Sequence, residues 1–231
     1  MTEPANPTSI ALHIGADFLE SPRHAAWPRL RACRDSVERL TELCDAAGIA
    51  TQHRLLGTDA TVGGVREAIA DAAAAVRPGG LLMLTFSGHS ERAVPDEHVG
   101  GWCLRDGTLY HAETALLLAG APPWSQLVVV ADTCYATSFA TVIADLPADT
   151  VLLAACGTNQ ATLDYPVSPF VSTLQRLTFP HQTPNPDCTS YSWLRRELRR
   201  DTPDVERPDV CANRPHAMHW QPFQPPTPKI E

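Results

Sequence analysis

The sequence predicts a three-layer α/β/α sandwich built on a mostly parallel β-sheet. Strand-like apolar runs alternate along the chain with segments of helical period, which is typical of a sheet covered by helices on both faces. Three central runs are almost continuously apolar, as expected for strands buried on both sides. A chain of 231 residues, 44% of them hydrophobic, can bury one sizeable core. We therefore expect one domain over residues 1–223 and a proline-rich tail over 224–231.

The first half of the chain predicts two strands and two helices. Residues 9–15 form the first predicted strand, and 49–56 form the second. Gly48 closes the helix between them, at a C-terminal position where glycine is favoured. Thr61 can cap the next helix, which ends in the Arg-Pro-Gly-Gly segment 77–80. The apolar positions that mark the first helix are Leu30, Cys33, Val37, Leu40 and Leu43.

The second half predicts three more strands and three more helices. Ser168 and Pro169 suit the N-cap and the first turn of a helix. Beyond Arg200 the chain is proline-rich and aperiodic, and no further element is predicted there. The strands cover 81–86, 127–131 and 151–155, and the helices cover 109–120, 168–177 and 190–200.

Charge and cysteine usage narrow the functional classes. A formal net charge of −8 argues against nucleic-acid binding, and the arginine-rich run 194–200 reads as the solvated face of a helix. The N-terminus lacks a signal-peptide pattern and no apolar stretch is long enough to cross a membrane. The seven cysteines have no paired spacing, which indicates reduced thiols. We expect a soluble cytoplasmic protein that binds neither nucleic acid nor membrane.

A histidine and a cysteine follow two of the predicted central strands. His89 lies three residues after strand 81–86, and Cys134 lies three residues after strand 127–131. Open α/β sheets place ligand sites at the carboxyl edge of their parallel strands. If the two strands are neighbours, an imidazole and a thiol come within reach of each other. This pair is suited to nucleophilic catalysis by a thiolate with a histidine as proton carrier.

These segments resemble the caspase and metacaspase family of cysteine peptidases. The similarity lies in "FSGHS" and "VVVADTCYATSF", in the opening strand "IALHIGADF", in the helix "LRACRDSVERLTELCDAAGI" and in "VLLAACGTNQATLDYPVSPFVSTL". It covers roughly residues 9–200 and is strongest toward the bacterial metacaspase-like branch. The resemblance implies a caspase-like α/β/α sandwich. It also implies a regulated protease of cell death or antiphage defence, with a protein substrate and a protein activator.

The resemblance assigns roles to individual residues. Cys134 would be the nucleophile, and His89 would handle protons. The backbone N–H groups of Ser90 and Cys134 would form the oxyanion hole. Asp132 would line a pocket for an arginine or lysine side chain, since a carboxylate is a good receptor for a guanidinium. The residues that match pocket positions beside Asp132 are Ser87, Cys33 and Ser36.

The chain departs from the family pattern at three places. Ser90 stands where the family has glycine, and Tyr135 follows the nucleophile where histidine is common. The second pocket carboxylate of the family falls on Ser36, with Asp35 one step away, which predicts a less acidic pocket.

No lysine or arginine lies between Cys134 and Arg176, so an enzyme selective for basic residues could not cut itself there. We therefore expect a single-chain enzyme.

Other readings of the same residues remain open. The substitutions at Ser90 and Tyr135 also fit a catalytically weak caspase-fold protein that acts as a scaffold or regulatory binding protein. Cys211, His216 and His219 lie close in sequence and could suggest a zinc-dependent hydrolase, but their spacing is not that of a standard site. The acidic loop 95–98 could bind calcium, on which many metacaspases depend, although solvated loop charge is the simpler interpretation. We expect no metal and no cofactor at the site itself, and we interpret Cys33, Cys44, Cys103, Cys156 and Cys188 as core or loop thiols.

Overall fold

A six-stranded sheet forms the centre of the molecule. The computed structural model describes residues 9–95, 97, 99–162, 165–202 and 206–225. The strands run in the order β2-β1-β3-β7-β8-β9, and all neighbouring pairs are parallel except β8 with β9. The predicted mostly parallel sheet is confirmed. Its strands are β1 (Ile10–Ala16), β2 (Thr51–Leu56), β3 (Leu81–Gly88), β7 (Gln126–Asp132), β8 (Asp149–Ala154) and β9 (Asp209–Ala212).

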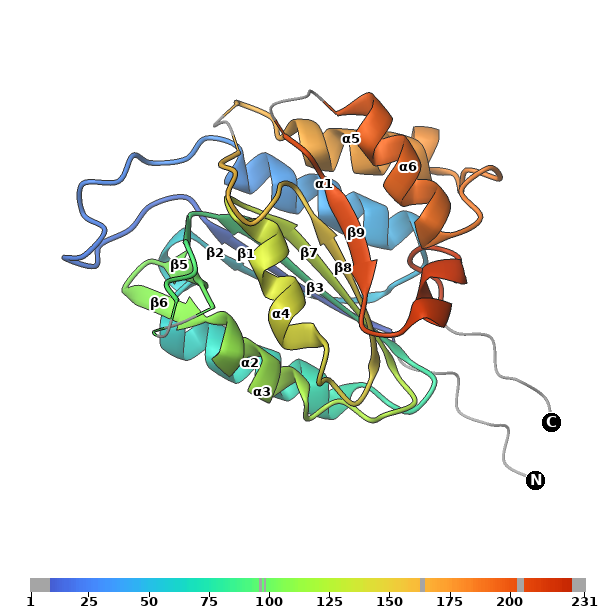
Figure 1. Cartoon of the computed structure of the whole chain (residues 1–231), viewed down its shortest axis with the longest axis horizontal. Coiled ribbons are helices and arrows are strands. Elements are labelled where there is room, and N and C mark those ends of the chain that lie inside the picture. The colour runs from blue at the N-terminus through green and yellow to red at the C-terminus, as the bar shows by residue number, and fades with distance from the viewer. Residues whose placement is uncertain (1–8, 96, 98, 163–164, 203–205, 226–231) are drawn as a thin grey trace.

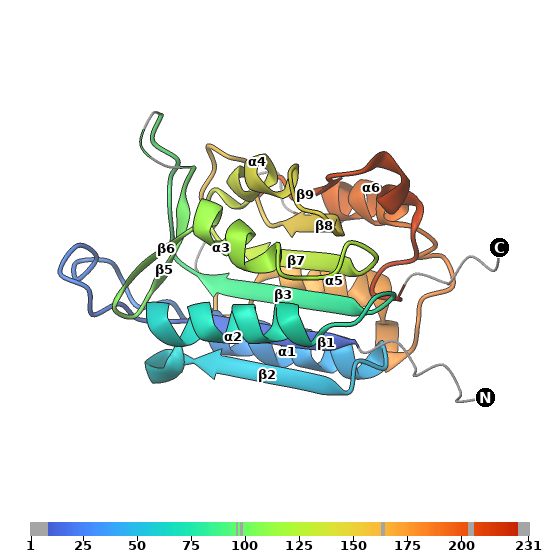
Figure 2. The same ribbon diagram turned by 90° about the horizontal axis from the view of Figure 1, so that it is seen from below.

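Helices cover both faces of this sheet, as the sequence predicts (Figures 1 and 2). One face carries α1 (Cys33–Ala46), α5 (Pro169–Thr178) and α6 (Tyr191–Asp201). The other face carries α2 (Val62–Ala75), α3 (His111–Leu118) and the short α4 (Ala140–Ile143). Each layer has its own hydrophobic core, because alternate residues of a strand point to opposite faces. In β3, Leu82 and Leu84 join one core, and Leu81 and Met83 join the other.

Local signals account for most helix ends. Thr61, Ser168 and Ser190 each accept a hydrogen bond from a backbone N–H in the first turn of α2, α5 and α6, respectively. Gly48 adopts a φ of 78° just beyond α1, a conformation that glycine tolerates well. The arginines of α6 are exposed and pair with nearby carboxylates, so the predicted solvated face is confirmed. Within the described residues, no helix is long and apolar enough to cross a membrane.

Two predicted boundaries are wrong, and one strand of the central sheet was not predicted. The first helix begins at Cys33, and Leu30 belongs to a long loop, 17–32, that leaves β1. The predicted helix 109–120 is shorter, because its first residues form strand β6 (Gly107–Tyr110). The aperiodic segment beyond Arg200 contains β9, an edge strand of four residues that is too short for its pattern to stand out.

A small antiparallel sheet was not predicted. It consists of β4 (Ser90–Glu91), β5 (Gly101–Leu104) and β6, and it follows β3 directly. Trp102 fixes this sheet to the core, because its ring stacks between Phe86 and Phe139 at centroid distances of 4.7 and 5.3 Å. The stack holds the residues after β3 against the body of the molecule.

Replacing Trp102 with alanine is expected to destabilise the protein by about 3–5 kcal/mol, the usual cost of removing a buried aromatic side chain. Trp102 is fully buried. Chemical denaturation followed by circular dichroism measures the change. Trp124→Ala is the matched control, because this side chain is 79% exposed and its loss should cost at most about 0.5 kcal/mol. Equal costs for the two variants would contradict the anchoring role.

Candidate functional site

A cleft opens at the carboxyl edge of the sheet. The strand order reverses direction between β1 and β3, and ligands of open α/β sheets bind at such a point. The loop after β1 and the ends of β3 and β7 meet there (Figure 1). The cleft has a volume of about 210 Å³ and is lined by residues from all three segments. Its size suits a single long side chain rather than a large ligand.

Both candidate catalytic residues line this cleft. Strands β3 and β7 are neighbours, and Ser87 lies opposite Asp132 in their register. The strands stay together beyond that pair, since the Thr133 hydroxyl donates to the Gly88 carbonyl at 2.7 Å. Continuing the same register brings His89 beside Cys134. Both residues therefore lie at the carboxyl edge of neighbouring strands and line one cleft. Direct contact between the imidazole and the thiol stays a prediction.

The imidazole of His89 is held by the loop after β1. Its Nε2 atom lies 2.8 Å from the carbonyl oxygen of Pro28. A carbonyl only accepts, so Nε2 carries the hydrogen and Nδ1 is the nitrogen that can take a proton. The ring of Trp27 packs edge-on against His89 at 5.2 Å. Sequence reasoning missed Pro28, because a backbone carbonyl in an irregular loop leaves no residue-type signal.

The thiol of Cys134 is half-buried on a strained turn. Tyr135, the next residue, has a φ of 54°, which is uncommon for a residue with a side chain. Its N–H donates to the Gln160 carbonyl at 2.8 Å, which stabilises the turn. The Cys134 sulfur lies 3.7 Å from the Thr162 hydroxyl. Thr162 is therefore a second contact that the sequence did not indicate.

Ser90, the candidate oxyanion-hole residue, lines a neighbouring cleft with Tyr135 rather than the cleft of His89 and Cys134. The Cys103 N–H donates to the His89 carbonyl at 2.9 Å, so the next pair along β4 and β5, Ser90 with Trp102, is a non-hydrogen-bonded pair. The Ser90 N–H consequently points away from β5. Ser90 is not among the described residues with positive φ, so serine is accommodated where the family has glycine. Its hydroxyl donates to the Cys134 carbonyl and ties the two segments together.

Asp132 lies at the base of the cleft and is surrounded by serine hydroxyl groups. Ser36 and Ser87 donate to Oδ2 at 2.8 and 2.9 Å, and Ser168 donates to Oδ1 at 2.7 Å. Burial raises the pKa of the Asp132 carboxyl above its ordinary value, and the three hydroxyl groups only partly offset this effect. A guanidinium or ammonium group entering the cleft would favour the ionised form. The site can therefore recognise a cation.

The other predicted pocket residues are also present. Cys33 lines the cleft, while Ser36 reaches Asp132 from the first turn of α1. Asp35 instead pairs with Arg39 at 2.8 Å. Glu206 supplies a second carboxyl group to the cleft, from the segment before β9. The sequence did not indicate Glu206, because that segment has no periodic pattern and reaches the cleft only through the tertiary fold. The position of the family's second carboxylate is held by Ser36, as predicted, but Glu206 brings a carboxyl group to the cleft from another segment.

Ser168 caps α5 and also contacts Asp132, and comparison with Ser190→Ala separates these two roles. Its hydroxyl accepts from the Val171 N–H as the cap of α5 and donates to Asp132. Ser168→Ala is expected to cost about 1 kcal/mol of stability, as is Ser190→Ala, which removes the cap of α6. If the cleft takes an arginine side chain, as the sequence predicts, only Ser168→Ala should raise the KM for an arginine peptide, by about tenfold, because it removes a hydrogen bond to a charged group. Thermal unfolding and steady-state kinetics test this, and equal KM values for both variants would contradict it.

The C-terminal histidines do not join Cys211. His216 pairs with Asp149 at 2.8 Å, and residues 215–219 form a 3₁₀ turn. Among the described residues, Cys211, His216 and His219 do not converge as a group of metal ligands. Two residues of the predicted calcium loop 95–98, Asp96 and His98, lie outside the described residues, as does most of the predicted tail.

No family model and no curated protein sequence matches the chain. The chain is similar to the crystal structure of protein GSU0716 from Geobacter sulfurreducens, a structural genomics target. The TM-score is 0.81 and the sequence identity 23%, over 96% of this chain and 100% of the other. At this level of identity the similarity establishes the fold and nothing further. The chain is therefore a mixed α/β protein that shares the architecture of this Geobacter protein.

Proposed function

We propose that this chain is a cysteine endopeptidase of the caspase and metacaspase type that cleaves protein substrates after arginine or lysine. The observation that carries the proposal is the convergence of His89, Cys134 and Asp132 on one cleft. An imidazole and a thiol there provide a nucleophile with its proton acceptor. The buried carboxyl at the base of the cleft provides a receptor for a cationic side chain.

The proposed reaction follows acyl-enzyme chemistry. His89 takes the thiol proton at Nδ1 while the sulfur of Cys134 attacks the scissile carbonyl. The N–H groups of Ser90 and Cys134 donate to the oxyanion of the tetrahedral intermediate. His89 then gives the proton to the leaving amine, and a thioester forms. Water, activated by His89, hydrolyses the thioester and restores the free thiol.

His89 is oriented for this role by the loop after β1. The Pro28 carbonyl fixes the tautomer, and Trp27 limits rotation of the ring. A third group that orients the base is a recurring feature of nucleophilic sites. Movement of the loop 17–32 would therefore change activity, which fits a protease controlled by a protein activator. We place that control, as the family resemblance implies, in cell death or antiphage defence.

A panel of fluorogenic peptides tests the proposal. Peptides with arginine, lysine or aspartate at the cleaved position are incubated with the full chain, with and without calcium. We expect turnover of arginine and lysine peptides and none of the aspartate peptide, because Asp132 and Glu206 repel an anion. Preference for aspartate would overturn the assigned specificity.

The second candidate function is a catalytically weak scaffold of the same fold. The contact between the Cys134 sulfur and Thr162 favours it, because the thiol has a hydroxyl neighbour that would compete with His89. An electrophilic peptide with an arginine next to its reactive carbon distinguishes the two functions. Labelling of Cys134 that depends on His89 supports the peptidase. Neither turnover nor labelling would favour the scaffold.

A further inference from the structure

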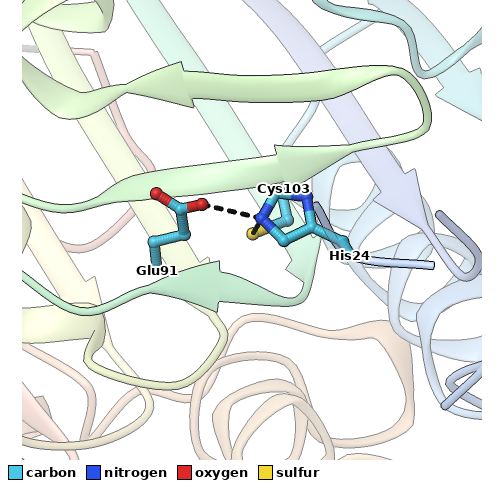
Figure 3. Close-up of side chains that lie close together, drawn as sticks. All are labelled: His24, Glu91 and Cys103. Carbon is cyan, nitrogen blue, oxygen red and sulfur yellow. Dashed lines mark hydrogen bonds and ion pairs between the residues drawn. The ribbon is translucent and has the colours of Figure 1, made fainter. Parts of the chain in front are cut away.

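A second group of reactive side chains lies outside the cleft. His24 belongs to the loop 17–32, Glu91 to β4 and Cys103 to β5, and their side chains lie close together (Figure 3). All three are buried. The His24 Nε2 atom lies 2.7 Å from Glu91 Oε1 and 3.9 Å from the Cys103 sulfur. All three candidate ligand atoms lie within 4.8 Å of one another. The sequence did not indicate this cluster, because its members are too far apart in the chain to form a motif.

We propose that His24, Glu91 and Cys103 form a binding site for a divalent transition metal ion of the zinc class. An imidazole nitrogen, a carboxylate oxygen and a thiolate sulfur are all common zinc ligands, and three protein ligands leave a fourth position for water. The sulfur ligand disfavours calcium and magnesium, which prefer oxygen.

The geometry requires only a small adjustment. Tetrahedral coordination with ordinary zinc distances separates neighbouring ligand atoms by roughly 3.4–3.6 Å. The His24 to Cys103 separation of 3.9 Å is already close to this range. The hydrogen bond between His24 and Glu91 would open by less than about 1 Å, because the ion replaces the shared hydrogen.

The exposure of Arg23 and an adjacent cleft allow a cation to reach Glu91 and displace the present contacts. Arg23 pairs with Glu91 at 2.9 Å, but its side chain is 61% exposed and can move into solvent. Burial, and then the charge of Glu91, raise the pKa of the Cys103 thiol to about 12, so the thiol is protonated without metal. Metal binding therefore releases the Cys103 proton to solvent, and the hydrogen of a neutral His24 moves from Nε2 to Nδ1, which leaves a thiolate and a neutral imidazole as ligands. An adjacent cleft of about 320 Å³, lined in part by His24 and Glu91, gives access for the ion and its water.

A bound ion would fasten the loop 17–32 to the small sheet. Trp27 packs edge-on against both His24, at 4.8 Å, and His89, at 5.2 Å. The same loop carries the Pro28 carbonyl that orients His89. The binding site does not depend on the proposed peptidase activity, but its effect on His89 rests on that proposal.

Cobalt titration of the full-length Cys134→Ala protein tests the site, because this background removes the cleft thiol. We expect one equivalent of Co²⁺ to produce a thiolate-to-cobalt charge-transfer band, and Zn²⁺ to abolish it by competition. The band should disappear in the Cys103→Ser variant of this background. Cys211→Ser is the matched control, since its half-buried thiol lies on β9, and it should leave the band unchanged.

The opposite results would overturn the proposal. Absence of the band in the Cys134→Ala protein, or its survival in the Cys103→Ser variant, excludes the assigned ligands. Should Cys103→Ser not fold, Glu91→Gln keeps the thiol and imidazole and should weaken Co²⁺ binding by at least about tenfold. Unchanged affinity in that variant would equally contradict the site. None of these outcomes depends on whether the chain cleaves peptides.

Discussion

Replacing Cys134 with alanine is expected to lower kcat for an arginine peptide by about 10⁴-fold or more, because loss of a nucleophile leaves only binding and oxyanion stabilisation. The fold should be unaffected, since the side chain is half-buried and the hydrogen bonds of its thiol, among the described residues, go to Thr162. Steady-state hydrolysis of the fluorogenic arginine peptide measures the effect. Circular dichroism confirms that the variant remains folded.

Two further variants make this result specific. Cys211→Ser changes another half-buried thiol, on β9, and should retain full activity. His89→Gln removes the proton acceptor and should lower kcat to a similar extent as Cys134→Ala. The variant that combines Cys134→Ala and His89→Gln should have a kcat little lower than that of either single variant, because residues that act as a unit give non-additive losses. Full activity in Cys134→Ala would refute the proposed mechanism.

Asp132→Asn is expected to lower kcat/KM for an arginine peptide by about 10²–10³-fold, since removing one partner of a buried charge pair costs several kcal/mol. A peptide with alanine at the cleaved position serves as control, because it carries no charge for Asp132 to bind. Asparagine can keep the local hydrogen bonds: its oxygen accepts from Ser36 and Ser87, and its amide donates to Ser168. An equal loss for both peptides would show that Asp132 supports the fold rather than specificity.

The same variant should have a distinct stability profile. The pKa of Asp132 is raised in the folded state, so the folded protein binds more protons than the unfolded chain between the two pKa values. Stability from this group is therefore greatest below the ordinary aspartate pKa of about 4 and is lost as pH rises through the folded pKa. At pH 7, Asp132→Asn should melt at the same temperature as the wild type or higher. Near pH 3 the melting temperature of Asp132→Asn should no longer exceed that of the wild type. A melting temperature of Asp132→Asn below that of the wild type at pH 7 would contradict this prediction.

Local patterns were sufficient for every strand of the central sheet except β9, and for the order of these strands and the main helices along the chain. The apolar runs of β3, β7 and β8 are continuous because both faces of these strands are covered, and few other structures produce that pattern. Caps such as Thr61 and Ser168 act within one helical turn, so their residue types are visible in the chain. That His89 and Cys134 line one cleft was predictable for the same reason, because each follows a recognisable parallel strand.

Short and irregular segments were not predictable. β4, β5 and β6 have two to four residues each, and β9 has four, so period-two alternation hardly develops. Their stability comes from tertiary contacts, such as the stacking of Trp102 between Phe86 and Phe139.

The candidate site also has features that local sequence patterns predict and features that only tertiary contacts decide. The chain alone determined which residues stand at the ends of β3 and β7, since strand position follows from local hydrophobicity. Only the tertiary structure decided that the Pro28 carbonyl orients His89, that Ser168 and Glu206 join the pocket of Asp132, and that His24 meets Cys103. These contacts join segments tens of residues apart through irregular loops, whose paths depend on packing and carry no periodic signal.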